Sequence, residues 1–356
     1  MQDWRHGGFG LYLHWPFCQS KCPYCDFNSH VAARIDQQAW AAAYLIELDR
    51  YAALTPDRTL DSVFFGGGTP SLMDPEIVDA ILTKIRALWA VSNQFEVTLE
   101  ANPTSVEAGR FAAYRAAGVN RVSMGVQALN DPDLRALGRL HSVAEAKAAF
   151  DIARSTFDRV SFDMIYARQD QTLPDWEAEL KQAFDMAIDH LSLYQLTIED
   201  GTAFGDRYAI GKLKGLPGDD LAADMFQTTQ DICGSNGMPA YEVSNHAKPG
   251  MECRHNLTYW RSGTWAGIGP GAHGRLKTNQ GLLATSTERN PERWLEMVRM
   301  LNHGMTTDEL LSQEEICDEY LLMGMRLYEG MDLHRLETMR GAPLDPVRLD
   351  DLLQHG

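Results

Sequence analysis

The sequence predicts an α/β protein with a parallel sheet at its core, and two observations lead to this fold class. Short runs rich in β-branched and aromatic residues recur along residues 10–196, and longer amphipathic stretches follow most of them. Strands that alternate with helices in this way are typical of βαβ units. Polar or glycine residues also stand at or just past the C-terminal ends of five runs, at Cys18, Gly66, Glu100, Gln127 and Asp163. Loops converge at that edge in α/β folds, so we expect the functional site there.

The elements can be predicted in order along the chain. The expected strands are residues 10–14, 62–65, 96–100, 121–125, 159–163 and 191–196. The expected helices between them include residues 39–54, 75–89, 105–117 and 142–153. Six such units fit a partial TIM-like (β/α)6 barrel and an open doubly wound sheet equally well.

The pattern changes after residue 196, and this predicts a second domain. Residues 201–218 are polar and rich in glycine, residues 219–234 predict a helix, and residues 241–274 indicate structured loop with short strands. Helices are then expected at residues 291–301, 314–327 and 333–339. Because 356 residues exceed one typical domain, we expect a core domain over 1–240 and a smaller, mostly helical domain over 241–356.

Composition limits the compartment and the partners. The chain is 44% hydrophobic and 23% charged, as in soluble globular proteins, and its longest apolar runs are too short to span a bilayer. Residues 1–6 lack an apolar signal region, and three of six cysteines are clustered, so we expect a reducing, cytoplasmic location. The net charge of −17 argues against a broad phosphate-binding surface, and therefore against nucleic acid as a partner.

Three cysteines within eight residues are the strongest chemical signal. Cys18, Cys22 and Cys25 follow the pattern C-x-x-x-C-x-x-C, whereas a closed zinc or iron–sulfur site normally has four protein ligands. A 4Fe-4S cluster on three thiolates leaves one iron open to a small molecule. An incomplete zinc knuckle and inert cytosolic thiols are the alternatives.

Further candidates stand at the ends of later strands. Gly67, Gly68 and Thr69 belong to a glycine run that lets the backbone approach a ligand, although a tight turn would also use it. Glu100 has a carboxylate suited to a ribose diol, or to capping a helix before Pro103.

Arg139 is suited to a carboxylate ligand, with an ordinary surface salt bridge as the alternative. Gln127 flanks the same unit, and Asp163 is a further ribose-side candidate. Tyr12 and Tyr24 can pack against a cluster or an adenine, or can belong to the core.

Taken together, these motifs resemble the radical S-adenosylmethionine (SAM) superfamily, and within it the oxygen-independent coproporphyrinogen III oxidase-like family. The matching runs are residues 11–18, 66–70, 100–103, 125–127 and 163–166. The resemblance implies a partial (β/α)6 radical SAM barrel, a 4Fe-4S cluster on the three cysteines, and SAM on the open iron. It also implies that SAM contacts Tyr12, Tyr24, Gly67, Gly68, Thr69, Glu100, Gln127, Arg139 and Asp163. The chain departs from the family at residues 167–170, and it ends where many members continue, so we expect a truncated or short C-terminal domain.

The residues after Cys25 distinguish two branches of this family. Coproporphyrinogen III dehydrogenases have a further cysteine two residues after the third ligand and a long N-terminal extension, whereas this chain has Phe27 and only seventeen residues before Cys18. It is more similar to the HemW-type heme chaperone branch. That resemblance implies heme binding, delivery of heme to respiratory proteins, and no dehydrogenase activity. Radical SAM decarboxylation of coproporphyrinogen III is the alternative.

A second run, residues 255–260, is similar to the H-N-x-x-Y-W motif of the heme chaperone branch. A neutral imidazole can be an axial ligand to heme iron, so His255 is the expected ligand. A histidine–aromatic cluster that only fills the domain seam is the alternative, and Cys253 is a rival thiolate ligand. The sequence leaves open the heme acceptor, a homodimer and peripheral membrane contact.

Overall fold

One twelve-stranded sheet runs through the computed structural model, which describes residues 6–355. Six parallel strands stand in chain order at its centre: β1 (Phe9–Trp15), β4 (Thr59–Gly67), β5 (Ala90–Ala101), β6 (Arg121–Gln127), β7 (Arg159–Tyr166) and β8 (His190–Gln195). They coincide with the six predicted strands, so the α/β fold is confirmed. Residues 1–5, on which part of the export argument rests, lie outside the described residues.

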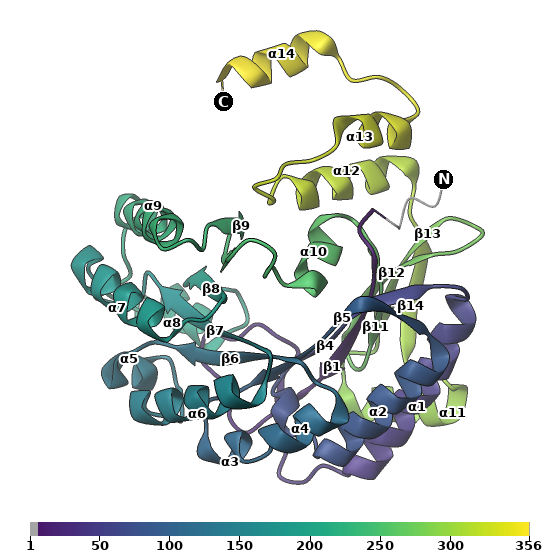
Figure 1. Cartoon of the computed structure of the whole chain (residues 1–356), viewed down its shortest axis with the longest axis horizontal. Helices are drawn as coiled ribbons and strands as arrows, with labels where there is room; N and C mark the ends of the chain where they lie inside the picture. Colours follow the sequence, from purple (N-terminus) through teal and green to yellow (C-terminus); the bar gives the residue numbers. More distant parts are fainter. Residues whose placement is uncertain (1–5, 356) are drawn as a thin grey trace.

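Helices connect these strands, and Figure 1 shows α1, α2, α4 and α6 along the outer side of the curved sheet. The helices are α1 (Gln37–Leu54), α2 (Pro75–Leu88), α3 (Ser105–Ala108), α4 (Phe111–Ala117), α5 (Asp131–Ala136), α6 (Val143–Thr156), α7 (Leu173–Met186), α8 (Ala203–Ala209) and α9 (Asp219–Ser235), with a 3-10 turn at Pro70–Leu72. The single helix expected over residues 105–117 is divided into α3 and α4, because Gly109 interrupts it and glycine is a poor helix former.

The two faces of the central strands differ in polarity. Val63, Val97 and Val122 are fully buried in the main apolar core, which also contains residues of the outer helices. Their neighbours Ser62 and Thr98 are just as buried, and they point to the opposite face because side chains alternate along a strand. Parallel sheets are usually apolar on both faces. The polar inner face therefore indicates a barrel interior built around hydrogen bonds.

Strands from the C-terminal part extend the same sheet. β11 pairs in parallel with β1, antiparallel β12–β14 follow it, and β10 and β9 lie beyond β8. The remaining elements are β9 (Ala240–Glu242), β10 (Asn245–Ala247), α10 (Arg254–Trp260), β11 (Thr264–Ile268), β12 (His273–Lys277), β13 (Leu282–Thr287), α11 (Pro291–Leu301), β14 (Met305–Leu310), α12 (Gln313–Gly324), α13 (Leu333–Arg340) and α14 (Pro346–His355). Sequence reasoning expected only short strands before residue 274, so the sheet extension is a new finding, while the domain boundary near residue 241 stays a prediction.

The C-terminal helices α10, α12, α13 and α14 lie on the opposite side of the sheet from α1 and α2, whereas α11 packs beside α1, with the ring of Trp294 stacked on that of Trp40. Figure 1 shows α10 close to the concave side, with α12, α13 and α14 stacked beyond it. None of the described helices is both long enough and apolar enough to cross a membrane.

Candidate functional site

The three clustered cysteines lie on a loop that is tied down at its base. Two short strands, β2 (Phe17–Cys18) and β3 (His30–Val31), pair in parallel where the loop begins and ends. Asn28 anchors the loop further, because its backbone oxygen is 2.9 Å from Nε2 of His14 and its side-chain amide donates to the backbone oxygen of Pro270 at 3.0 Å. The cysteines are therefore held against the C-terminal end of β1.

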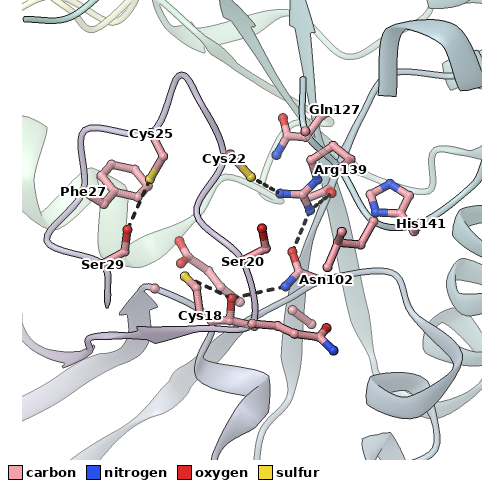
Figure 2. A pocket seen from close by; sticks show the side chains of 18 of the residues that line it. Cys18, Ser20, Cys22, Cys25, Phe27, Ser29, Asn102, Gln127, Arg139 and His141 are labelled. Carbon is pink, nitrogen blue, oxygen red and sulfur yellow. Dashed lines mark hydrogen bonds between the residues drawn. The ribbon is translucent and has the colours of Figure 1, made fainter. Parts of the chain in front are cut away.

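All three thiols line one pocket, together with residues from the ends of β4–β7 (Figure 2). Thr69 Oγ1 donates to Sγ of Cys18 at 3.5 Å, and Arg139 Nη1 donates to Sγ of Cys22 at 3.3 Å. The hydroxyl of Ser29 lies 3.7 Å from Sγ of Cys25. Each sulfur thus has a polar neighbour of the kind that tunes an iron–sulfur cluster.

The spacing of the three thiols bears on the kind of metal site that they could form. Among residues 6–355, no group of three histidine, cysteine or acidic side chains is placed to hold one metal ion. A cubane instead has its irons on separate corners, so its ligands can stand apart around a cavity. Burial raises the pKa of the Cys18 and Cys25 thiols, so a bound cation is needed to favour their thiolate forms there.

The glycine run at the end of β4 packs directly against the base of the cysteine loop. Gly67 has a φ of +110°, and a Cβ there would lie 2.6 Å from the ring of His14. A Cβ on Gly68 would lie 2.7 Å from the backbone oxygen of Phe17. Both glycines also line the pocket. Only glycine allows this close approach, which brings the backbone of β4 beside the cysteines.

Two carboxylates line the pocket from β5 and β7, the strands on either side of β6. Glu100 is paired in register with Ser123 of β6, and Ser123 Oγ donates to Oδ1 of Asp163 at 3.3 Å. Burial, with the charge of Asp163 added, raises the pKa of Glu100 to about 8. Burial likewise raises the pKa of Asp163 to about 6. The pair can therefore both accept and donate hydrogen bonds to a diol near neutral pH.

Arg139 has an unused donor in this pocket. Its Nη2 donates to Oδ1 of Asn102 at 2.6 Å and to the backbone oxygen of Gly125 at 2.7 Å. Its Nε is buried and finds no hydrogen-bond partner among the described residues. An anionic ligand would satisfy this donor, as the predicted SAM carboxylate would. Asn102, which also donates to Thr69, was not predicted as a site residue, although its place two residues after Glu100 was a signal.

Three more side chains complete the walls of the pocket. Gln127 ends β6 with a φ of 75°, and a residue other than glycine in that region is characteristic of functional sites. Tyr24 lines the pocket, with its ring centroid 6.4 Å from that of Phe204. His141 was not predicted. Burial and the charge of Arg139 lower its pKa to about 4, so it is neutral near pH 7.

The structure thus brings together every predicted cluster and SAM residue except Tyr12, which lines adjoining cavities. The hydroxyl of Tyr12 lies 3.0 Å from Nδ1 of His14, and its ring stacks on that of His255.

His255 itself lies inside the barrel, away from the cysteines. Its Nδ1 is 2.8 Å from the hydroxyl of Ser62, and its Nε2 is 2.7 Å from that of Tyr259. Both ring nitrogens therefore have partners, and iron ligation by His255, which stays a prediction, would break one of these bonds. Cys253 is fully buried 3.6 Å from Glu96, and burial raises its pKa to about 11.

Comparisons with known proteins show the family of the chain. The model of the radical SAM superfamily matches residues 12–183. The heme chaperone HemW of Escherichia coli (strain K12) is 40% identical, over 97% of this chain and 90% of that protein. A mitochondrial radical S-adenosyl methionine domain-containing protein 1 from Bos taurus is 39% identical, over 90% of this chain and 74% of its own length.

Among solved structures, coproporphyrinogen III oxidase (HemN) from Escherichia coli, a radical SAM enzyme, aligns with a TM-score of 0.78. The alignment covers 96% of this chain and 81% of that one, and its 21% identity speaks for the fold alone. The family within this superfamily is assigned from the sequence relatives, which include HemW heme chaperones from several bacteria. The chain therefore belongs to the radical SAM superfamily and, within it, to the family of the HemW heme chaperones.

Proposed function

We propose that this chain is a cytoplasmic heme chaperone of radical SAM type, which binds a 4Fe-4S cluster, SAM and heme and delivers heme to respiratory hemoproteins. One observation carries the proposal: three thiols, an unsatisfied arginine donor and two carboxylates line a single pocket. The relatives named as heme chaperones, at about 40% identity over most of the chain, support the heme part.

Each side chain of the pocket has a part in this proposal. Cys18, Cys22 and Cys25 would hold the cluster, and a reduced cluster bound there could supply an electron to SAM. Arg139 binds the carboxylate of SAM, and the β4 glycine run with Thr69 receives its amino group. Glu100 and Asp163 bind the ribose hydroxyls, while Gln127 and Tyr24 form walls of the pocket. Tyr12 lines the cavities that adjoin this pocket.

Phe27 favours the chaperone over the dehydrogenase. Its side chain is 58% exposed and borders the cluster pocket, at the position where the dehydrogenase branch carries a cysteine. An aromatic ring at this position offers an apolar surface to a bound molecule, whereas a cysteine would offer a reactive thiol.

Anaerobic reconstitution followed by two parallel assays tests the proposal. We expect stable binding of hemin, seen as a Soret band, and no conversion of coproporphyrinogen III to protoporphyrinogen IX with SAM and a reductant. Turnover of coproporphyrinogen III would establish the dehydrogenase instead. Cys22→Ser is expected to lower the bound iron and SAM, whereas Cys317→Ser, at a buried cysteine of α12, is the matched control that leaves both unchanged.

A further inference from the structure

A second cavity, of about 600 Å3, adjoins the cluster pocket. Phe27, Gly67 and Glu100 border both spaces, so a molecule in the second cavity would lie beside the SAM site. Its other walls come from the cysteine loop, α10, the β11–β12 region and α12. The volume lies within the range of pockets that hold cofactors and small molecules.

Aromatic side chains form part of the walls of this cavity, beside polar ones that include Asp26, Asn28 and Glu100. Phe27, Tyr259, Trp260 and Trp265 line it, and Met323 of α12 adds a thioether. The Tyr259 and Trp265 rings are fixed edge to face with centroids 4.7 Å apart. Such walls offer a large, preformed apolar area to a flat conjugated ring system.

An arginine without an ion-pair partner among the described residues lines the cavity. Arg289 lines the cavity and is exposed, and no carboxylate within residues 6–355 forms an ion pair with its guanidinium. The ion pairs nearby involve Arg293 with Glu288 and Arg275 with Glu319. Arg289 is therefore available to a carboxylate carried by a ligand.

One imidazole in this region is available to a metal. His14 lines the cavity, but its two ring nitrogens are paired with Tyr12 and with the backbone of Asn28. His255 is also paired on both sides. His273, at the start of β12, lines the cavity, is exposed, and makes no side-chain hydrogen bond to any described residue.

We infer that this cavity binds heme, with His273 as a ligand to the iron and Arg289 bound to a propionate. The inference rests on the proposed function and moves the axial ligand from His255, which sequence reasoning favoured, to His273.

Titration of the reconstituted protein with hemin tests the ligand. His273→Ala is expected to shift the Soret band of the unaltered protein and to weaken hemin binding at least tenfold, and added imidazole is expected to restore the band. His334→Ala, at an exposed histidine of α13, is the matched control and should leave both unchanged. His255→Gln should keep the Soret position of the unaltered protein.

Protoporphyrin IX, which lacks iron, tests the cavity separately. Its binding should survive His273→Ala and should weaken several-fold in Arg289→Glu, but not in Arg293→Glu at the neighbouring exposed arginine. Two results would overturn the inference and leave the proposed function standing. One is an unchanged Soret band and an unchanged affinity for hemin in His273→Ala. The other is loss of the Soret band in His255→Gln but not in His273→Ala. Failure of the unaltered protein to bind hemin would overturn both.

Discussion

Glu100 and Asp163 have carboxyl groups whose pKa values lie on opposite sides of neutrality. Burial is the main cause in both cases, raising the pKa of Glu100 to about 8 and that of Asp163 to about 6. At pH 7 Glu100 therefore keeps its proton while Asp163 is largely ionised. One carboxyl can donate and the other accept, which suits two adjacent hydroxyl groups.

The raised pKa of Glu100 makes stability depend on pH. The folded protein keeps a proton that the unfolded chain releases above its ordinary pKa near 4.5, so folding becomes less favourable as pH rises from about 5 to about 8. Glu100→Gln removes this titration. We expect the variant to gain stability over the unaltered protein between pH 5 and pH 8 in urea unfolding without cluster or SAM. Glu309→Gln, at an exposed site in β14, should show no such change, and a pH-independent difference for Glu100→Gln would contradict the assignment.

Arg139 provides a second prediction for single residues. Arg139→Gln removes the charged donor that we propose binds the SAM carboxylate, and a hydrogen bond to a charged group contributes about 1.5–3 kcal/mol. We therefore expect SAM to bind roughly tenfold to a hundredfold more weakly in equilibrium dialysis with the reconstituted protein. Arg135→Gln, on the exposed side of α5, is the control. Unchanged affinity at equal iron content would show that Arg139 does not bind the ligand.

At the scale of elements, the short helix α10 depends on its close fit inside the barrel. A Cβ on Gly10 of β1 would lie 3.0 Å from Nδ1 of His255 and 3.0 Å from the hydroxyl of Ser62. Gly10→Ala should therefore displace α10 and lower the free energy of unfolding by about 1–3 kcal/mol, measured by chemical denaturation.

The matched control for Gly10 lies in α9. A Cβ on Gly234 has no atom within 4 Å, and alanine is favoured over glycine in a helix by up to about 1 kcal/mol. Gly234→Ala should leave stability unchanged or raise it. Equal stability of Gly10→Ala and the unaltered protein would mean that α10 is not held by this contact.

At the scale of the whole molecule, a half-buried ion pair joins the C-terminal helices to the barrel. Arg326, just after α12, donates to Glu242 of β9 at 3.0 Å, and its guanidinium lies 4.5 Å from the ring centroid of Trp260. The Glu242 side chain is fully buried, so loss of its cation leaves a charge without full compensation.

Arg326→Ala should therefore lower the free energy of unfolding by about 2–3 kcal/mol, near the lower end for buried pairs because Arg326 is partly exposed. Faster proteolysis within residues 313–355 should accompany the loss. Arg348→Ala breaks an exposed pair with Asp345 and should cost no more than about 0.5 kcal/mol. Equal effects of the two substitutions would contradict the role of Arg326.

Sequence reasoning succeeded where the signal is local. The six central strands are apolar runs beside helical patterns. The residues predicted to bind a cluster and SAM fall at strand ends, where parallel topology brings most of them together in one pocket. β11 was not predicted as part of the main sheet, because it is five residues long with a glycine inside it and its pairing with β1 joins distant parts of the chain. His273 and Arg289 lie beside the cysteine loop only through that same long-range pairing, so no local pattern reveals them.

The shared wall of the two cavities has a thermodynamic consequence. Phe27, Gly67 and Glu100 border both the cluster pocket and the larger cavity, so the occupant of one space meets side chains that shape the other. Thermodynamic linkage makes such coupling reciprocal. If bound SAM changes the affinity for heme by some factor, bound heme must change the affinity for SAM by the same factor. Two titrations, each with and without the other ligand, must therefore give one coupling free energy. Under the proposed function, SAM that tightens heme binding would help the protein to retain heme, and SAM that weakens it would drive release of heme.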